Sequence, residues 1–118
     1  MATPTRHITV TTTISGPPAV RRGSTLVYYV TLKNTSQNSY LLDPCPDYNE
    51  FLGAKQVWAS FQLNCRPVRK ISPGANAVFE MHLVIPSTFP IGASELTWAL
   101  LDGRLTIPVA HASISVTN

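Results

Sequence analysis

The sequence predicts an all-β protein, an antiparallel Greek-key sandwich of about seven strands. Apolar and polar residues alternate with period two in several segments, which places one face of each strand on a core. Turn signals rich in glycine, proline and asparagine separate these segments at regular intervals. No segment has the apolar spacing of a convincing helix. These three observations together favour two packed sheets over any helical fold.

Three strands are predicted in the N-terminal part of the chain. Residues 8–14 alternate and end at the Gly16-Pro17-Pro18 turn, and residues 26–32 form the second strand. A polar turn over residues 34–39 follows, because its side chains bond their own backbone. A third, short strand over residues 40–42 is expected to break at Pro44, which donates no backbone hydrogen bond.

The rest of the chain alternates just as clearly. Further strands are predicted at residues 57–63, 77–85, 96–100 and 104–116. Asp102-Gly103 predicts a tight two-residue hairpin turn, and Pro108 predicts a bulge or a switch of sheet inside the last strand. Residues 44–56 are irregular by composition, and we expect a short helical turn around Asn49 to Leu52.

Length and composition predict one domain over residues 1–118, with a flexible N-terminus at residues 1–6. Charged residues make up only 13% of the chain, and its net charge of +3 is too small and too scattered to indicate nucleic acid. No apolar run approaches the ~20 residues of a membrane span. Membrane association is therefore expected only through an anchor elsewhere in a larger protein.

Cys45 and Cys65 are the only cysteines, and they are either a disulfide or two unrelated thiols. A disulfide would place the protein outside the cytoplasm. The bridge would close about twenty residues and stabilise the fold by roughly 3 kcal/mol in the chain-entropy model. The N-terminus has no apolar run of the signal-peptide kind, so this alternative predicts a domain of a larger secreted or membrane-anchored protein. The other alternative is a cytosolic protein with two free thiols.

Several short sequence segments, taken together, resemble those of a known group of domains. They are residues 20–26 with 30–36, Ile71-Ser72-Pro73-Gly74 before residues 78–81, and Ile91-Gly92 before a strand. This combination resembles the bacterial immunoglobulin-like sandwich domains of secreted and membrane-anchored proteins. The Pro44-Cys45-Pro46-x-Tyr48 and Leu63-Asn64-Cys65 pair is similar to uncharacterised actinobacterial-type members. The resemblance implies an immunoglobulin-like fold, an extracytoplasmic location and a binding, spacer or assembly role, and it transfers no catalytic residue.

The favoured function is non-enzymatic: protein–protein interaction or spacing between domains of a parent chain. The segment from Asp43 to Gln56, held by the disulfide, is the expected contact surface, because a preorganised loop loses little freedom on binding. Its candidate binding residues are Asp47, Tyr48, Glu50, Phe51 and Trp58. The partner is expected to be a protein or a neighbouring domain.

The alternative function is a carbohydrate-binding module. Flat aromatic rings supply rigid contact area for sugar faces, and Tyr48, Trp58 and Tyr40 are the candidates. This function requires the three rings to be exposed and coplanar. Trp98 is in phase with its apolar neighbours and is expected in the core instead.

Metal binding and catalysis have weaker support. His7 and His111 lie in terminal strands that can pair, and Met81 is a soft ligand for copper, but surface histidines are the simpler interpretation. Three acids share the segment before Trp58 without the regular spacing of a calcium loop: Asp43, Asp47 and Glu50. No nucleophile, base and oxyanion motif occurs, so we expect no enzyme, no cofactor and no metal.

Overall fold

The computed structural model describes residues 8–53 and 57–118, and all regular secondary structure within them is β-strand. The strands are β1 (Val10–Ser15), β2 (Ala19–Arg21), β3 (Thr25–Asn34), β4 (Tyr40–Leu41), β5 (Asp47–Leu52), β6 (Val57–Gln62), β7 (Lys70–Ile71), β8 (Asn76–Val84), β9 (Gly92–Leu101) and β10 (Val109–Thr117). No helix in the described residues is long and apolar enough to cross a membrane.

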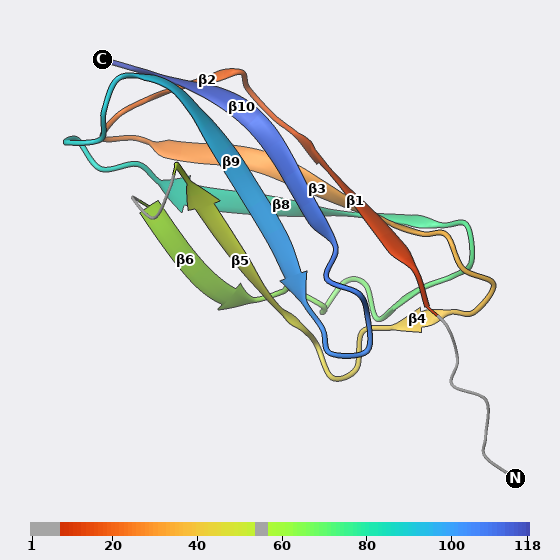
Figure 1. Cartoon of the computed structure of the whole chain (residues 1–118). Helices are drawn as coiled ribbons and strands as arrows, with labels where there is room; N and C mark the ends of the chain where they lie inside the picture. The colour runs from red at the N-terminus through yellow and green to blue at the C-terminus, as the bar shows by residue number, and fades with distance from the viewer. Residues whose placement is uncertain (1–7, 54–56) are drawn as a thin grey trace, which may run out of the picture.

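Two sheets face one another, and in Figure 1 β9 and β10 (blue) cross in front of β3 and β8. One sheet has the order β1-β3-β8, and the other has the order β2-β10-β9-β5-β6. The chain crosses between the sheets after β3, after β6 and again after β8, which is a Greek-key path. A separate two-stranded pair, β4-β7, lies at one end. The predicted immunoglobulin-like Greek-key sandwich is confirmed.

The N-terminal segment serves both sheets. β1 pairs antiparallel with β3, while β2 pairs parallel with β10. The switch occurs at Gly16-Pro17-Pro18, where two residues without a backbone N–H interrupt any ladder. Gly16 passes so close to β3 that an added Cβ would lie 2.8 Å from the Cβ of Tyr28.

The core lies between the two sheets and is built from the inward positions of each strand. In β8 the burial alternates over all nine residues, from exposed Asn76 to exposed Val84. The largest fully buried side chains are Trp98, Tyr28, Tyr40, Leu26, Leu32, Leu52, Ile71, Ile85, Leu96, Leu100, Glu50 and Val30. The prediction that Trp98 belongs to the core is confirmed, and one carboxylate, Glu50, is buried among these apolar residues.

Three local predictions are wrong. The segment from Asn49 to Leu52 is part of strand β5, because its alternate residues fill the core and its backbone pairs with β6 and β9. Asp102-Gly103 does not form a two-residue hairpin turn: a longer loop joins β9 to β10, and the last strand begins only at Val109. Pro108 therefore precedes the strand and causes neither a bulge nor a switch of sheet within it.

Candidate functional site

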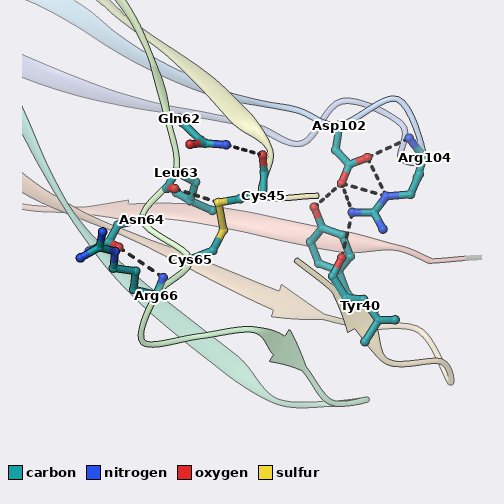
Figure 2. The surroundings of a disulfide bond; sticks show 10 residues. Tyr40, Cys45, Gln62, Leu63, Asn64, Cys65, Arg66, Asp102 and Arg104 are labelled. Atoms are coloured by element: carbon teal, nitrogen blue, oxygen red, sulfur yellow. Dashed lines mark hydrogen bonds and ion pairs between the residues drawn. A yellow bond between two sulfur atoms is a disulfide. The ribbon is translucent and has the colours of Figure 1, made fainter. Parts of the chain in front are cut away.

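The disulfide closes the open end of the β5–β6 hairpin. The Sγ atoms of Cys45 and Cys65 are 2.00 Å apart, and the Cα atoms are 5.9 Å apart. Cys45 lies just before β5 and Cys65 just after β6, and the Leu63 N–H donates to the carbonyl of Pro46 at 2.8 Å. Figure 2 shows this arrangement together with the bond from the Gln62 amide to the carbonyl of Cys45. The predicted bridge is confirmed, but it joins two neighbouring strands instead of clamping an irregular loop.

A surface hollow of about 710 Å³ lies beside this bridge. We call it the disulfide groove, and it is lined by Leu41, Leu42, Asp43, Cys45, Gln62, Leu63, Asn64, Cys65, Arg66, Arg69 and Lys70. Leu42 and Leu63 are buried and form an apolar floor. Backbone bonds hold its walls, because the Leu42 N–H donates to the carbonyl of Arg69 at 2.9 Å. The groove is therefore bordered by fixed backbone on both sides.

The rim of the disulfide groove is basic. Arg66, Arg69 and Lys70 contribute three cations, and Asp43 is the one acid among the lining residues. The three cations are exposed, and none of them has an ion-pair partner among the described residues. Such a cluster attracts anionic groups, because the neighbouring positive charges add to one local potential.

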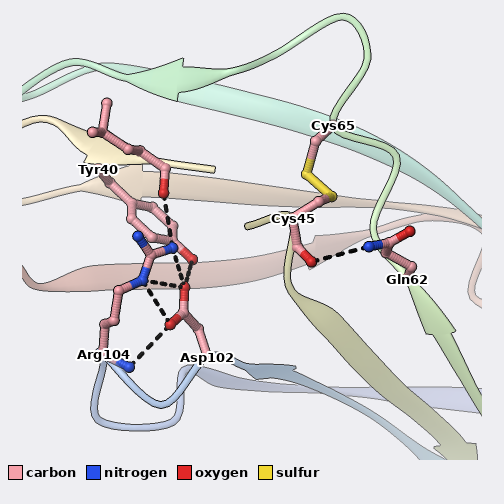
Figure 3. A network of polar contacts seen from close by, with 7 residues as sticks. Tyr40, Cys45, Gln62, Cys65, Asp102 and Arg104 are labelled. Atoms are coloured by element: carbon pink, nitrogen blue, oxygen red, sulfur yellow. Dashed lines mark hydrogen bonds and ion pairs between the residues drawn. A yellow bond between two sulfur atoms is a disulfide. The ribbon is translucent and has the colours of Figure 1, made fainter. Parts of the chain in front are cut away.

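A polar network of Tyr40, Asp102 and Arg104, shown in Figure 3, contacts the groove-lining residue Leu41. The Tyr40 hydroxyl donates to Oδ2 of Asp102 at 2.6 Å, and Nη2 of Arg104 donates to the same oxygen at 2.8 Å. Arg104 also donates to the carbonyl of Leu41 at 2.8 Å, so the β9–β10 loop holds β4 in place. Burial raises the pKa of Asp102, but the hydrogen bonds from Arg104 and Tyr40 outweigh it and lower that pKa to about 2.

The candidate binding residues of β5 divide between two faces, because successive side chains of a strand point in opposite directions. Tyr48 and Glu50 point into the core and are 8% and 0% exposed. Asp47 is exposed and Phe51 is half-buried on the other face. The backbone of Trp58 pairs with that of Phe51, and its side chain lies outside the described part of the chain. The five residues therefore do not form one contact surface.

The aromatic platform of the carbohydrate alternative is also not formed. Tyr48 stacks on Trp98 inside the sandwich, with ring centroids 5.5 Å apart, and Tyr40 is 1% exposed. Both rings were expected to be exposed. They are buried because their strands place them on the inner face, so sugar binding through this set is contradicted.

Glu50, predicted to lie on the contact surface, is instead a fully buried carboxylate. It alternates with Tyr48 and Leu52 and therefore shares their inward face. The Tyr28 hydroxyl donates to its Oε1 at 2.5 Å, while Oε2 has no partner in the described residues. Burial raises the pKa of Glu50 to about 6, although the hydrogen bond from Tyr28 acts in the opposite direction.

The residues considered for metal binding are dispersed. His7 lies outside the described residues. Nδ1 of His111 is hydrogen-bonded to the Thr97 hydroxyl at 3.0 Å and lies 3.3 Å from Oε1 of Glu95. Met81 is 2% exposed and belongs to the core. Glu50 is buried between the sheets while Asp47 faces solvent, so the three acids do not converge. The described residues include no group of three or more potential metal ligands.

Comparison with known proteins shows similarity at the level of structure only. No protein-family model matches the sequence, and no curated protein matches it. The solution structure of a CARDB domain from Pyrococcus furiosus is similar over 93% of this chain and 95% of that domain, with a TM-score of 0.62 and 17% identity. A crystal structure of the same domain, in complex with di-metal ions, also has a TM-score of 0.62, with 15% identity over 93% of this chain and 89% of that one.

Larger proteins contain the same fold as one part. Spo0M, a sporulation control protein from Bacillus subtilis, matches over 94% of this chain and 49% of its own length, with a TM-score of 0.58 and 18% identity. A β-glucosidase from Listeria innocua matches 95% of this chain but only 16% of the enzyme, with a TM-score of 0.58 and 11% identity. At these identities the likeness shows the fold alone, and the chain is an immunoglobulin-like β-sandwich similar to CARDB domains.

Proposed function

We propose that this chain is a non-catalytic, extracytoplasmic module that binds an acidic segment of a partner protein, or of a neighbouring domain in its own parent chain. The binding site is the disulfide groove. The observation that supports this most strongly is the set of three exposed cations, Arg66, Arg69 and Lys70, beside a hollow of about 710 Å³ with a disulfide-held wall.

Rigid walls favour binding because less conformational freedom is lost when a partner docks. The bridge between Cys45 and Cys65 holds one wall, and the bond from Arg104 to the carbonyl of Leu41 holds the other. The cations supply attraction and orientation for carboxylates, with Arg66 and Arg69 able to bind them bidentately. Among the lining residues the exposed side chain of Leu41 offers an apolar contact beside those carboxylates.

The extracytoplasmic part of the proposal depends on the disulfide, because such bonds persist in oxidising compartments and are rare in the cytosol. The fold similarity adds support for a modular role. In the β-glucosidase the similar region is 16% of the chain, which is the size of an appended domain and not of a whole enzyme.

The experiment is an NMR titration of the ¹⁵N-labelled protein with a synthetic peptide in which Glu alternates with Leu and Ser. The same peptide with Gln in place of Glu is the chemical control. We expect shift changes at residues 41–43 and 62–70 with the Glu peptide, weakened by added salt because exposed charges are screened. Shift changes spread over the whole surface, or equal binding of the Gln peptide, would contradict the proposal.

A pair of charge-matched variants separates the groove from general charge effects. Arg66→Gln/Arg69→Gln removes two cations from the groove, and Arg21→Gln/Lys33→Gln removes two exposed cations elsewhere. We expect the first variant to bind the Glu peptide up to about tenfold more weakly, since each exposed ion pair contributes at most about 1 kcal/mol. The second variant should bind like the wild type. Equal losses in both variants would exclude the groove as the site.

A further inference from the structure

The edge of the three-stranded sheet at β8 has no strand beside it. β8 is the terminal strand in the order β1-β3-β8, and its nine residues pair with β3 on one side only. Among the described residues, no other segment exchanges backbone hydrogen bonds with Asn76–Val84. A hollow of about 290 Å³ separates residues 78–81 of this edge from Tyr48, Gln62, Asn64 and Pro67. An unpaired edge of this length is a template for another strand.

Three of the usual protective features of an edge strand, lysine, proline and a bulge, are missing from β8. Natural edges are blunted by lysine, proline or a bulge, and Asn76–Val84 contains neither lysine nor proline. Its burial alternates without interruption, so no bulge twists it away from a partner. Its outward face also carries two exposed valines, since Val78 is 59% and Val84 is 68% exposed. The edge strand is therefore regular, free of bulges and partly apolar on its outward face.

Asn76 begins the outward face of β8, and the four outward residues that follow are symmetric in chemical type. They are Val78, Glu80, His82 and Val84, an apolar residue at each end with an acid and a base between them. We propose that β8 pairs antiparallel with β8 of a second copy of this chain, about a two-fold axis at Met81. In this register Val78 faces Val84 of the second copy, and Glu80 faces His82 of the second copy, each contact occurring twice.

Charge complementarity selects this register over its neighbours. A slip that centres the pairing on Glu80 places the two Glu80 carboxylates opposite each other, and one centred on His82 places the two imidazoles opposite each other. Like charges directly opposite each other destabilise a sheet, whereas opposite charges stabilise it. A slip by one residue would place the outer face of one three-stranded sheet on the same side as the packed face of the other, so the two outward faces would no longer meet.

The polar groups at the centre of the edge are already arranged for this contact. Glu80 accepts a hydrogen bond from the Tyr29 hydroxyl at 3.2 Å and lies 2.8 Å from Nε2 of His82. These hydrogen bonds, from His82 first and then Tyr29, lower the pKa of Glu80, so the carboxylate stays ionised. It can therefore accept a further hydrogen bond from a second imidazole across the interface. The residues opposite this pair on the neighbouring strand are Tyr29 and Val27.

The product would be one continuous sheet, with three strands from each copy. Its two five-stranded sheets would remain on the outside of the pair. No residue of β8 lines the disulfide groove, although Gln62 and Asn64 border both the groove and the hollow beside β8. The proposed pairing is argued from β8 alone and does not depend on what the groove binds. A dimer of this kind would present two grooves and raise the apparent affinity for a bivalent partner.

The test is sedimentation velocity over a concentration series at about pH 6. The wild type is expected to form dimers. His82→Glu places Glu opposite Glu, and Glu80→His places His opposite His, so each variant alone should dimerise about tenfold more weakly or worse. An equimolar mixture of the two variants should dimerise again, because every Glu then faces a His.

The control is Thr11→Glu, which adds a negative charge to the opposite edge strand, β1, at an exposed position. It should dimerise like the wild type, and circular dichroism should show that all variants are folded. A monomeric wild type would overturn the proposal and leave the edge to a different chain. Unchanged dimerisation of His82→Glu, or a mixture that stays monomeric while both variants are folded, would overturn it as well.

Discussion

The buried carboxylate of Glu50 makes the stability of this protein depend on pH in an unusual direction. Its pKa rises from the ordinary 4.5 to about 6 because burial disfavours the charged form. Its stabilising contribution is therefore complete below about pH 4.5 and is lost as the pH rises through 6. A change of this size in pKa corresponds to about 2 kcal/mol of unfolding free energy. Near neutral pH the ionised Glu50 thus destabilises the fold by that amount relative to acid pH.

Glu50→Gln removes the ionisation while keeping the shape of the side chain and an oxygen that can accept the bond from Tyr28. We expect the unfolding free energy of the variant, minus that of the wild type, to rise by about 2 kcal/mol between pH 4 and pH 7.5. The new amide nitrogen would lie where Oε2 has no hydrogen-bond partner among the described residues, which changes the unfolding free energy of the variant by the same amount at every pH. The rise between the two pH values does not depend on that constant change. Urea unfolding at several pH values measures it.

A second variant tests the cause of the effect. Tyr28→Phe removes the hydrogen bond that favours the charged carboxylate, so the pKa of Glu50 should rise further and the pH-dependent loss should grow. The carboxyl carbon shift of Glu50, followed by ¹³C NMR, reports its titration directly. Parallel stability profiles of wild type and Glu50→Gln across this pH range would refute the reasoning, because they would mean that Glu50 titrates as it does in the unfolded chain.

Three further predictions concern stability. Cys45→Ala/Cys65→Ala should lower the unfolding free energy, measured in urea, by about 3 kcal/mol, because the bridge closes a separation of 20 residues. In the wild type, alkylation should detect both thiols only after reduction. Asp102→Asn should lower the unfolding free energy by about 1–2 kcal/mol at pH 7 and by almost nothing near pH 2. The reason is that the carboxylate, with a pKa of about 2, stabilises the fold above pH 3.8 and loses that effect as the pH falls through 2. Equal losses of unfolding free energy at both pH values would contradict the prediction. Gly16→Ala should lower the unfolding free energy by about 1–3 kcal/mol, because the added Cβ would lie 2.8 Å from β3, whereas Gly103→Ala, with nothing within 4 Å, should leave it unchanged. Similar unfolding free energies for both variants would show that the close approach relaxes freely.

Most of the strand assignments were predictable because a strand with one buried face has apolar and polar residues that alternate along the sequence. β8 is the clearest case, with every second residue buried from Ala77 to Leu83. β5 was missed because the prolines at 44 and 46 made its surroundings look irregular, and because a glutamate was assumed to face solvent. Its true signal was the phase that Glu50 shares with Tyr48 and Leu52.

The disulfide groove was only partly predictable. The sequence predicted a Cys45–Cys65 disulfide as one of two alternatives. The position of that disulfide between neighbouring strands depends on the β5–β6 register, which the sequence did not predict. The basic rim joins residues 66–70 to residues 41–43, and the network behind it joins Tyr40 to Asp102. Contacts between segments so far apart in the chain leave no local pattern in the sequence.

The sequence by itself determined that this is an all-β sandwich, which residues of most strands face the core, and that its cysteines were able to pair. These properties are local, because they depend on period-two burial and on turn residues that act on their own backbone. Only the tertiary structure decided that Glu50 and Tyr48 are buried, that three cations gather beside the bridge, and that β8 is left as a free edge. These properties depend on which strands become neighbours, and strand order is set by the packing of the whole chain.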